Sequence, residues 1–215
     1  MTSHYLSLAW ILEHQVDYFI FDYQGYGISP GTPSQRKTVD DGAGAISWAQ
    51  DYLRKNHWES KTPLVILAQS LGGAVALRGL TELSVEAKQQ VRLVLLDSTF
   101  IEYTDATRSV LSQHWLTWPF QWLGEIVISD KFSAKGLLNE LPQAATYVVM
   151  HGDHDRTIDY SLGEDLFNRL PTNNKAFWKV SGGTHTSGFW QKNPEFRTKF
   201  LNAIEGVSSH GIKLE

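Results

Sequence analysis

The segment 64–80 constrains the fold more than any other, because it predicts a strand, a tight turn and a helix in immediate succession. Residues 64–67 are apolar and β-branched in the middle, which is typical of a buried strand. The small residues of Ala68-Gln69-Ser70-Leu71-Gly72-Gly73 follow, and residues 74–80 have the composition of a helix. Strands that alternate with helices in this way indicate a mostly parallel sheet covered by helices.

Ser70 stands at the point of this turn, in the position of a nucleophile elbow. The ideal pattern has glycine two residues before and two residues after the serine, and Ala68 replaces the first of them. The backbone N–H of Leu71 opens the expected helix, where a developing oxyanion is stabilised. Ser70 is therefore a candidate nucleophile, and the Leu71 N–H is a candidate oxyanion donor. The alternative is an ordinary strand–turn–helix with a surface serine.

Candidate partners for Ser70 follow in the chain order serine, acid, histidine that such an elbow requires. A serine hydroxyl needs a base, and the base needs a third group to orient it. Asp153 and Asp155 lie in the loop after one expected strand, and His185 lies in the loop after the next. We therefore interpret Ser70, one of these carboxylates and His185 as a candidate catalytic triad.

With these motifs the chain resembles the α/β-hydrolases, and among them the Bem46-like serine hydrolases. The matching motifs are Phe21-Asp22-Tyr23-Gln24-Gly25-Tyr26-Gly27-Ile28-Ser29, the turn at 68–73, His151-Gly152-Asp153-His154-Asp155 and Gly183-Thr184-His185. The family's G-x-x-D pattern implies that Asp155 is the triad acid, with Asp153 a turn residue whose carboxylate caps backbone N–H groups. The resemblance implies acyl transfer on a small ester-like substrate (carboxylester, thioester or amide) without a cofactor.

The order of the expected elements fits one α/β-hydrolase domain over 1–207, with a doubly wound, mostly parallel sheet and a flexible tail over 208–215. Strands are expected at 18–22, 64–68, 91–97, 146–151 and 176–180, and helices at 4–14, 37–55, 71–80, 160–170 and 194–205. The last of these helices begins with Pro194, a residue that favours the first helical turn.

One strand of the family's sheet has no counterpart in the sequence. It would lie between the strands expected at 18–22 and 64–68, and the loop after it would supply a second oxyanion N–H. Residues 1–4 look like the end of that loop, so we expect an N-terminally truncated version of the fold. A start codon assigned at an internal methionine, a genuine fragment and a rearranged fold are the three explanations.

The segment 100–141 is long and aromatic, and α/β-hydrolases carry cap insertions at this place. We expect a short helical cap in which Trp115, Trp118 and Trp122, together with Gln69, line a substrate pocket beside the serine. The alternative is a helical excursion whose tryptophans pack on the edge of the sheet, because spacings of three and four residues mark any buried helix face.

The global composition excludes several other classes. A formal net charge of −4 with no run of basic residues argues against nucleic acid as a partner. No apolar stretch reaches the length of a membrane span, and cysteine is absent. The oligomeric state stays open. Nothing points to a compartment, so the cytoplasm is the default, with an anchor or signal before Met1 left open.

Two other hypotheses remain beside the serine hydrolase. The cluster His151, Asp153, His154 and Asp155 contains ligands that suit zinc, so a metal-dependent hydrolase is one alternative, although we expect no metal. A catalytically impaired or interaction-only relative, with a partner strand in the gap, is the other.

Overall fold

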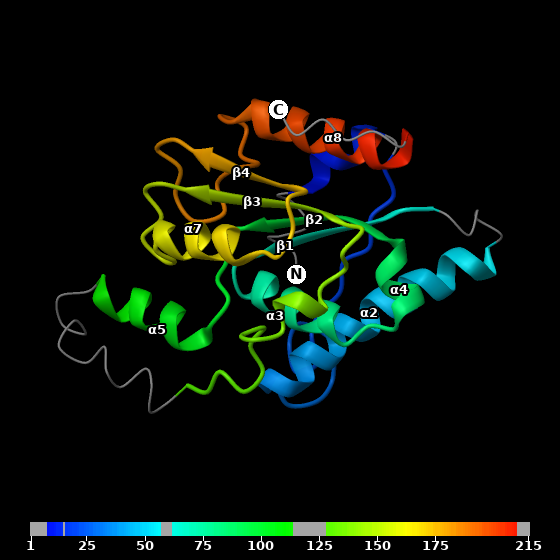
Figure 1. The fold of residues 1–215 in the computed structure, drawn as a ribbon, viewed down its shortest axis with the longest axis horizontal. Coiled ribbons are helices and arrows are strands. Elements are labelled where there is room, and N and C mark those ends of the chain that lie inside the picture. Colours follow the sequence, from blue (N-terminus) through cyan, green and yellow to red (C-terminus); the bar gives the residue numbers. More distant parts are fainter. Residues whose placement is uncertain (1–7, 15, 57–61, 114–127, 210–215) are drawn as a thin grey trace.

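The computed structural model describes residues 8–14, 16–56, 62–113 and 128–209, and its centre is a parallel sheet flanked by helices (Figure 1). Among these residues the sheet has four strands in the order β1-β2-β3-β4, and every neighbouring pair is parallel. The strands are β1 (Leu64–Gln69), β2 (Val91–Asp97), β3 (Thr146–Gly152) and β4 (Lys175–Val180). This confirms the predicted doubly wound parallel sheet of the α/β-hydrolase fold.

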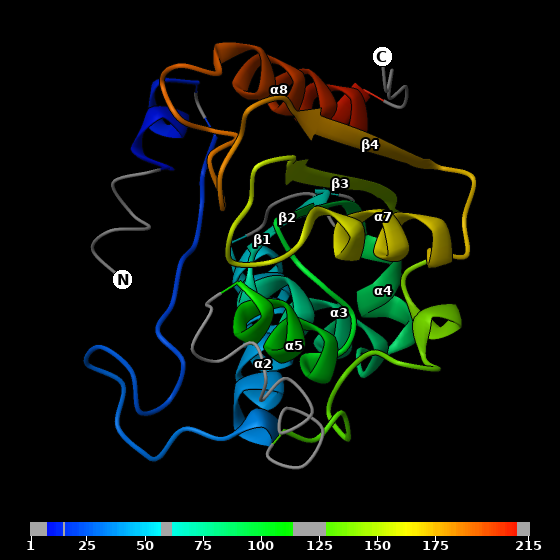
Figure 2. The same cartoon turned by 90° about the vertical axis from the view of Figure 1, so that its left-hand side faces the viewer.

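Helices cover both faces of the sheet, as the two perpendicular views show (Figures 1 and 2). The helices α2, α3 and α7 lie on one face, and α8 with the short 3₁₀ helix η1 lies on the other. The bounds are η1 (Ala9–His14), α2 (Gln35–Lys55), α3 (Leu71–Thr81), α4 (Val85–Gln90), α5 (Tyr103–Ser112), η3 (Leu138–Glu140), α7 (Tyr160–Arg169) and α8 (Pro194–Ser209).

The central strands are buried on both faces, which explains their nearly continuous apolar sequences. Neighbouring residues of β3 illustrate this: Val148 packs into the core under α8, and Val149 packs into the core under α3 and α7. Both valines are fully buried. Within the described part of the chain, β1 pairs with β2 alone, and most of its side chains are half-buried.

Several helix starts follow capping rules that the sequence contains. The hydroxyl of Ser34 accepts a hydrogen bond from the Lys37 N–H, and the Ser84 hydroxyl accepts one from the Ala87 N–H. The α8 helix begins at Pro194, as predicted, and continues to Ser209. It therefore enters the segment expected to be a tail, and residues 210–215 lie outside the described part of the chain.

The prediction of a strand at 18–22 is wrong. Residues 16–23 are not assigned to any strand, and the segment between η1 and α2 runs along the side of the molecule (Figure 2). A strand exists only where its N–H and C=O groups pair with a neighbour, and the described sheet ends at β1. Phe19 instead packs its ring on Trp48 of α2, with 4.5 Å between the ring centroids. The described part of the helix predicted at 4–14 is the 3₁₀ helix η1.

Candidate active site

The candidate residues Ser70, Asp155 and His185 come from three loops at one edge of the sheet. Ser70 follows β1, Asp155 lies in the loop after β3, and His185 lies in the loop after β4. The carboxyl ends of parallel strands meet at a common edge, which is where ligands bind in open α/β sheets. Three segments that are far apart in the sequence therefore meet because the strands are parallel.

The three side chains form a continuous hydrogen-bonded chain. The Nδ1 atom of His185 lies 2.8 Å from Oδ2 of Asp155, and its Nε2 atom lies 2.8 Å from Oγ of Ser70. An ionised carboxylate only accepts hydrogen bonds, so Nδ1 carries the proton and Nε2 presents its lone pair to the hydroxyl. This is the arrangement in which an imidazole can remove the proton of a serine.

The turn that carries Ser70 is strained and held by backbone hydrogen bonds. Ser70 has φ 52° and ψ −126°, a conformation that L-residues rarely adopt. Its N–H donates to the Asp97 carbonyl at 2.8 Å, and its own carbonyl accepts from the Gly73 N–H at 2.9 Å. Leu71 is the first residue of α3, so its N–H has no acceptor within the helix.

Asp155 is buried and held by donors from several directions. Its Oδ1 atom accepts the N–H groups of Thr157 at 2.8 Å and Ile158 at 3.0 Å. The Nε2 atom of the buried His151 lies 3.4 Å from Oδ2. Burial by itself would raise the pKa of Asp155, but the hydrogen bonds that it accepts outweigh burial and hold that pKa below its ordinary value. The carboxylate therefore stays ionised when it orients His185.

Asp153 has a different environment, in keeping with the turn role predicted for it. It accepts the Gly182 N–H at 2.6 Å and pairs with Lys179 at 3.2 Å. The two loops also approach closely, since a Cβ atom at Gly152 would lie 2.3 Å from the Gly183 carbonyl oxygen. Asp153 therefore connects the loop after β3 to the loop after β4. It makes no hydrogen bond or ion pair with His185.

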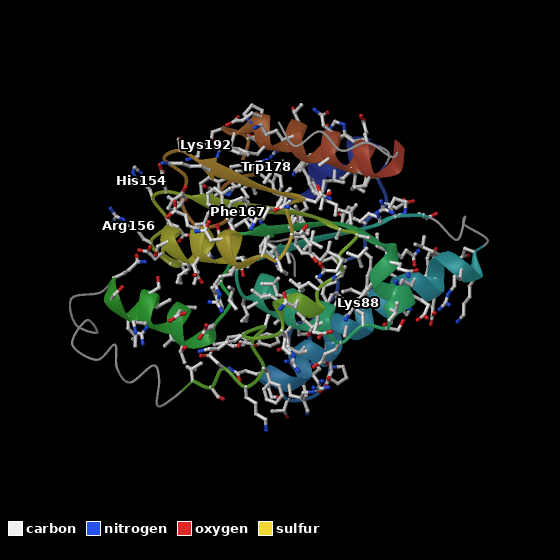
Figure 3. All side chains as sticks on the ribbon, viewed as in Figure 1. Lys88, His154, Arg156, Phe167, Trp178 and Lys192 are labelled. Atoms are coloured by element: carbon white, nitrogen blue, oxygen red, sulfur yellow. The ribbon has the colours of Figure 1, made fainter. Side chains whose placement is uncertain are left out.

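The residues of the 151–155 cluster do not converge as metal ligands would. His151 is fully buried and its Nε2 atom lies 3.0 Å from the Ile158 carbonyl oxygen, whereas His154 is exposed. His154 and Arg156 lie at the outer edge of the molecule (Figure 3). The described residues contain no group of three side chains that could hold a metal ion.

The predicted substrate pocket receives little support from the described residues. Trp115, Trp118 and Trp122 lie outside them. The amide of Gln69 donates from Nε2 to Oδ2 of Asp97 at 2.7 Å and is engaged in that contact. An open cavity of about 360 Å³ lies elsewhere, and its walls are Phe19, Phe21, Asp22, Asp40, Asp41, Gly44, Ala45 and Trp48.

The sequence analysis did not single out the segment Asp97-Ser98-Thr99, which follows β2. All three residues are buried, and they contact both the Ser70 turn and the loop of His185. The signal that could have found them is a run of polar residues at the end of an otherwise apolar central strand, next to the strand that carries Ser70.

Comparison with solved structures identifies the class of fold. A monoacylglycerol lipase from Paleococcus ferrophilus superimposes with a TM-score of 0.60 at 16% identity, over 97% of this chain and 90% of the lipase. The esterase Pf2001 of Pyrococcus furiosus gives a TM-score of 0.61 at 16% identity, over 89% of this chain and 69% of the esterase. The fold is thus that of the α/β hydrolases.

The profile of the family described as serine aminopeptidase, S33, matches residues 3–139. The chain belongs to this family of α/β hydrolases.

The uncharacterized protein YfhR of Salmonella typhimurium is 28% identical over 195 residues, which are 88% of this chain. The chain spans about three fifths of that relative, 61% of its length. None of the described helices is long and apolar enough to cross a membrane.

Proposed function

We propose that this chain is a serine hydrolase of the Bem46-like kind, which acts by acyl transfer on small ester-like substrates. The observation that carries the proposal is the hydrogen-bonded chain from Asp155 through His185 to Ser70, with 2.8 Å at each step. A serine aligned with an oriented imidazole is the signature of an activated nucleophile.

The geometry supports a role for each of these residues. His185 Nε2 takes the proton of Ser70 while Oγ attacks the substrate carbonyl, and the negative charge develops beside the N–H of Leu71. The protonated imidazole, stabilised by Asp155, then donates its proton to the leaving alcohol. Water, deprotonated by His185, attacks the acyl-enzyme, and the imidazole returns that proton to Oγ of Ser70 as the acid is released. The loop expected to supply a second oxyanion donor, near residues 1–4, lies outside the described residues.

The first measurement is covalent labelling of the purified chain with a fluorophosphonate probe, with the modified residue located by mass spectrometry. We expect labelling at Ser70 that is lost on heating and in His185→Ala. Hydrolysis of short p-nitrophenyl esters should fall by about 10⁴-fold or more in Ser70→Ala, because the nucleophile is gone. Asp153→Asn is the matched control, and it should keep most of the activity because Asp153 does not contact His185.

Turnover retained in Ser70→Ala would overturn the mechanism. A folded chain that is not labelled would favour the interaction-only relative instead. Esters are the first substrates to test because the similar folds include a lipase and an esterase. Aminoacyl p-nitroanilides test the amide alternative that the family description suggests.

A further inference from the structure

We propose that Ser98 is a positioning residue, which holds the His185 loop at the correct distance from the Ser70 turn. This inference rests on the proposed serine hydrolase function and adds a residue to it that acts through others. Ser98 follows β2, which lies between the strand that carries Ser70 and the strand that leads to Asp155.

The first observation is where the backbone is strained. Among the described residues, the non-glycine positions with positive φ are Ser70 at 52°, Ser98 at 53° and Thr186 at 52°. Each directly or closely follows a strand, and Thr186 is the residue after His185. L-residues occupy this region only where the surroundings hold them in it, and such positions concentrate at functional sites.

The second observation is that the segment 97–99 connects these strained positions. On one side, the Ser70 N–H donates to the Asp97 carbonyl at 2.8 Å, and the Thr99 hydroxyl donates to the Ser70 carbonyl at 2.7 Å. On the other side, the Thr186 N–H donates to Oγ of Ser98 at 3.0 Å. The Ser98 N–H itself donates to the Met150 carbonyl at 2.8 Å, which fixes the segment to β3.

The third observation is the direction of the Ser98 hydroxyl. Its hydrogen is donated to Oδ1 of Asp97 at 3.1 Å, which leaves an oxygen lone pair for the Thr186 N–H. The other oxygen of Asp97 accepts from Gln69 at 2.7 Å. Ser98 is fully buried and Asp97 is 1% exposed, so water cannot replace a partner that is removed.

The consequence concerns the alignment of His185 with Ser70. A hydrogen bond of 2.8 Å between Nε2 and Oγ tolerates little displacement, and a shift of about 1 Å in a catalytic group can cost about 10²-fold in rate. Loss of the Ser98 hydroxyl leaves the Thr186 N–H without its acceptor, so the backbone beside His185 loses the contact that sets its position. Because this contact joins two parts of the chain to each other, we expect its loss to affect kcat more than KM.

The test compares Ser98→Ala, Ser98→Gly and a matched control. Both Ser98 variants remove the hydroxyl, but glycine also relieves the strained φ, so the two separate the hydroxyl from the backbone conformation. Thr146→Val is the control, because it also removes a fully buried hydroxyl, one that accepts a hydrogen bond from Nδ2 of Asn174 at 2.6 Å, and Thr146 begins β3 at the edge of the sheet opposite the site.

We expect kcat for p-nitrophenyl esters to fall about 10- to 100-fold in both Ser98 variants, with KM changed less than about 2-fold. The control should keep the wild-type kcat. A Ser98→Gly protein with wild-type kcat would overturn the inference, because the hydroxyl would then have no positioning role.

A second readout does not depend on activity. Amide hydrogen exchange measured by NMR should show the Thr186 N–H exchanging at least 10-fold faster in both variants than in the wild-type chain, because it loses its acceptor. Unchanged exchange overturns the positioning role even if the wild-type chain is inactive. A wild-type chain without Ser70 labelling contradicts the proposed function alone.

Discussion

At the scale of single residues, Asp155 is the carboxylate whose charge matters most for the proposed reaction. We predict that Asp155→Asn lowers kcat by about 10⁴-fold, because the amide can no longer hold His185 in the tautomer that presents a free Nε2. The measurement is steady-state ester hydrolysis by the variant, compared with the Asp153→Asn control. A loss of less than 10-fold would contradict the assignment of Asp155 as the acid.

The same residue makes stability depend on pH. The pKa of Asp155 in the folded chain lies below its ordinary value, so its stabilising contribution is complete above the pKa of about 3.9 that an unfolded chain shows. That contribution is lost as the pH falls below this value. Urea unfolding should therefore show Asp155→Asn less stable than wild type at pH 7, with the difference shrinking below pH 4.

The effect of Asp97 on the pH dependence of stability should be opposite to that of Asp155. Burial raises its pKa to about 6, against the lowering effects of hydrogen bonds from Gln69 and Ser98. When the pKa of a carboxyl group is higher in the folded chain than in the unfolded chain, the folded state is destabilised at every pH above the unfolded-state pKa. For Asp97 this destabilisation grows between about pH 4 and pH 6. We predict that the stability of Asp97→Asn relative to wild type rises by on the order of 2 kcal/mol between pH 4 and pH 7.5, measured by urea unfolding. A constant difference across this pH range would contradict the buried charge.

At the scale of elements, the approach of α3 to the end of β2 explains why the residues after Ser70 are small. A Cβ atom at Gly73 would lie 2.3 Å from Oγ1 of Thr99, whereas a Cβ atom at Gly72 would have its nearest neighbour at 3.8 Å, the hydroxyl of Tyr23. The two glycines look equivalent in the sequence, but only one is required by packing.

This contrast gives a matched pair of variants. Gly73→Ala should lose about 1–3 kcal/mol of unfolding free energy and most of the ester hydrolysis, because α3 must move away from Thr99 and carries Leu71 with it. Gly72→Ala should keep stability within about 1 kcal/mol. The measurements are thermal unfolding and kcat of the two variants. Equal effects in both would contradict the close approach of Gly73 to Thr99.

At the scale of the whole molecule, helical layers on both faces make nearly every position of the two central strands a core position, with Arg92 of β2 an exception. Val148 and Val149 are adjacent on β3 and fully buried in different clusters. We predict that Val148→Ala and Val149→Ala each cost about 2 kcal/mol, from the lost methyl groups and the cavity left behind. The exposed Arg92 of β2 is the control, and Arg92→Ala should change stability by less than about 0.5 kcal/mol in urea unfolding.

In a sheet covered by helices on one face only, alanine substitutions would lower stability at every second position of a strand. A large loss of stability in one valine variant and none in its neighbour would therefore contradict the presence of helical layers on both faces.

The local features of this protein could be predicted from its sequence. The apolar run before Ser70, the small residues after it and Pro194 at the start of α8 are patterns of neighbouring residues, so the strand, the turn and the helix could be predicted from them. The order of Ser70, the acids at 153 and 155 and His185 along alternating strands predicted that these segments meet, because parallel strands bring their carboxyl ends to one edge, and the resemblance to the family selected Asp155.

Features that depend on partners distant in the chain became visible when the strands and helices were placed in space. The segment 18–22 has the composition of a strand, but pairing requires a neighbour, and the described sheet ends at β1. Ser98 has no motif of its own, and its contacts with Asp97 and Thr186 arise only when β2 is placed beside the other strands. Local patterns specify which structure a segment can form, whereas hydrogen bonding and burial between distant segments decide which of these possibilities is realised.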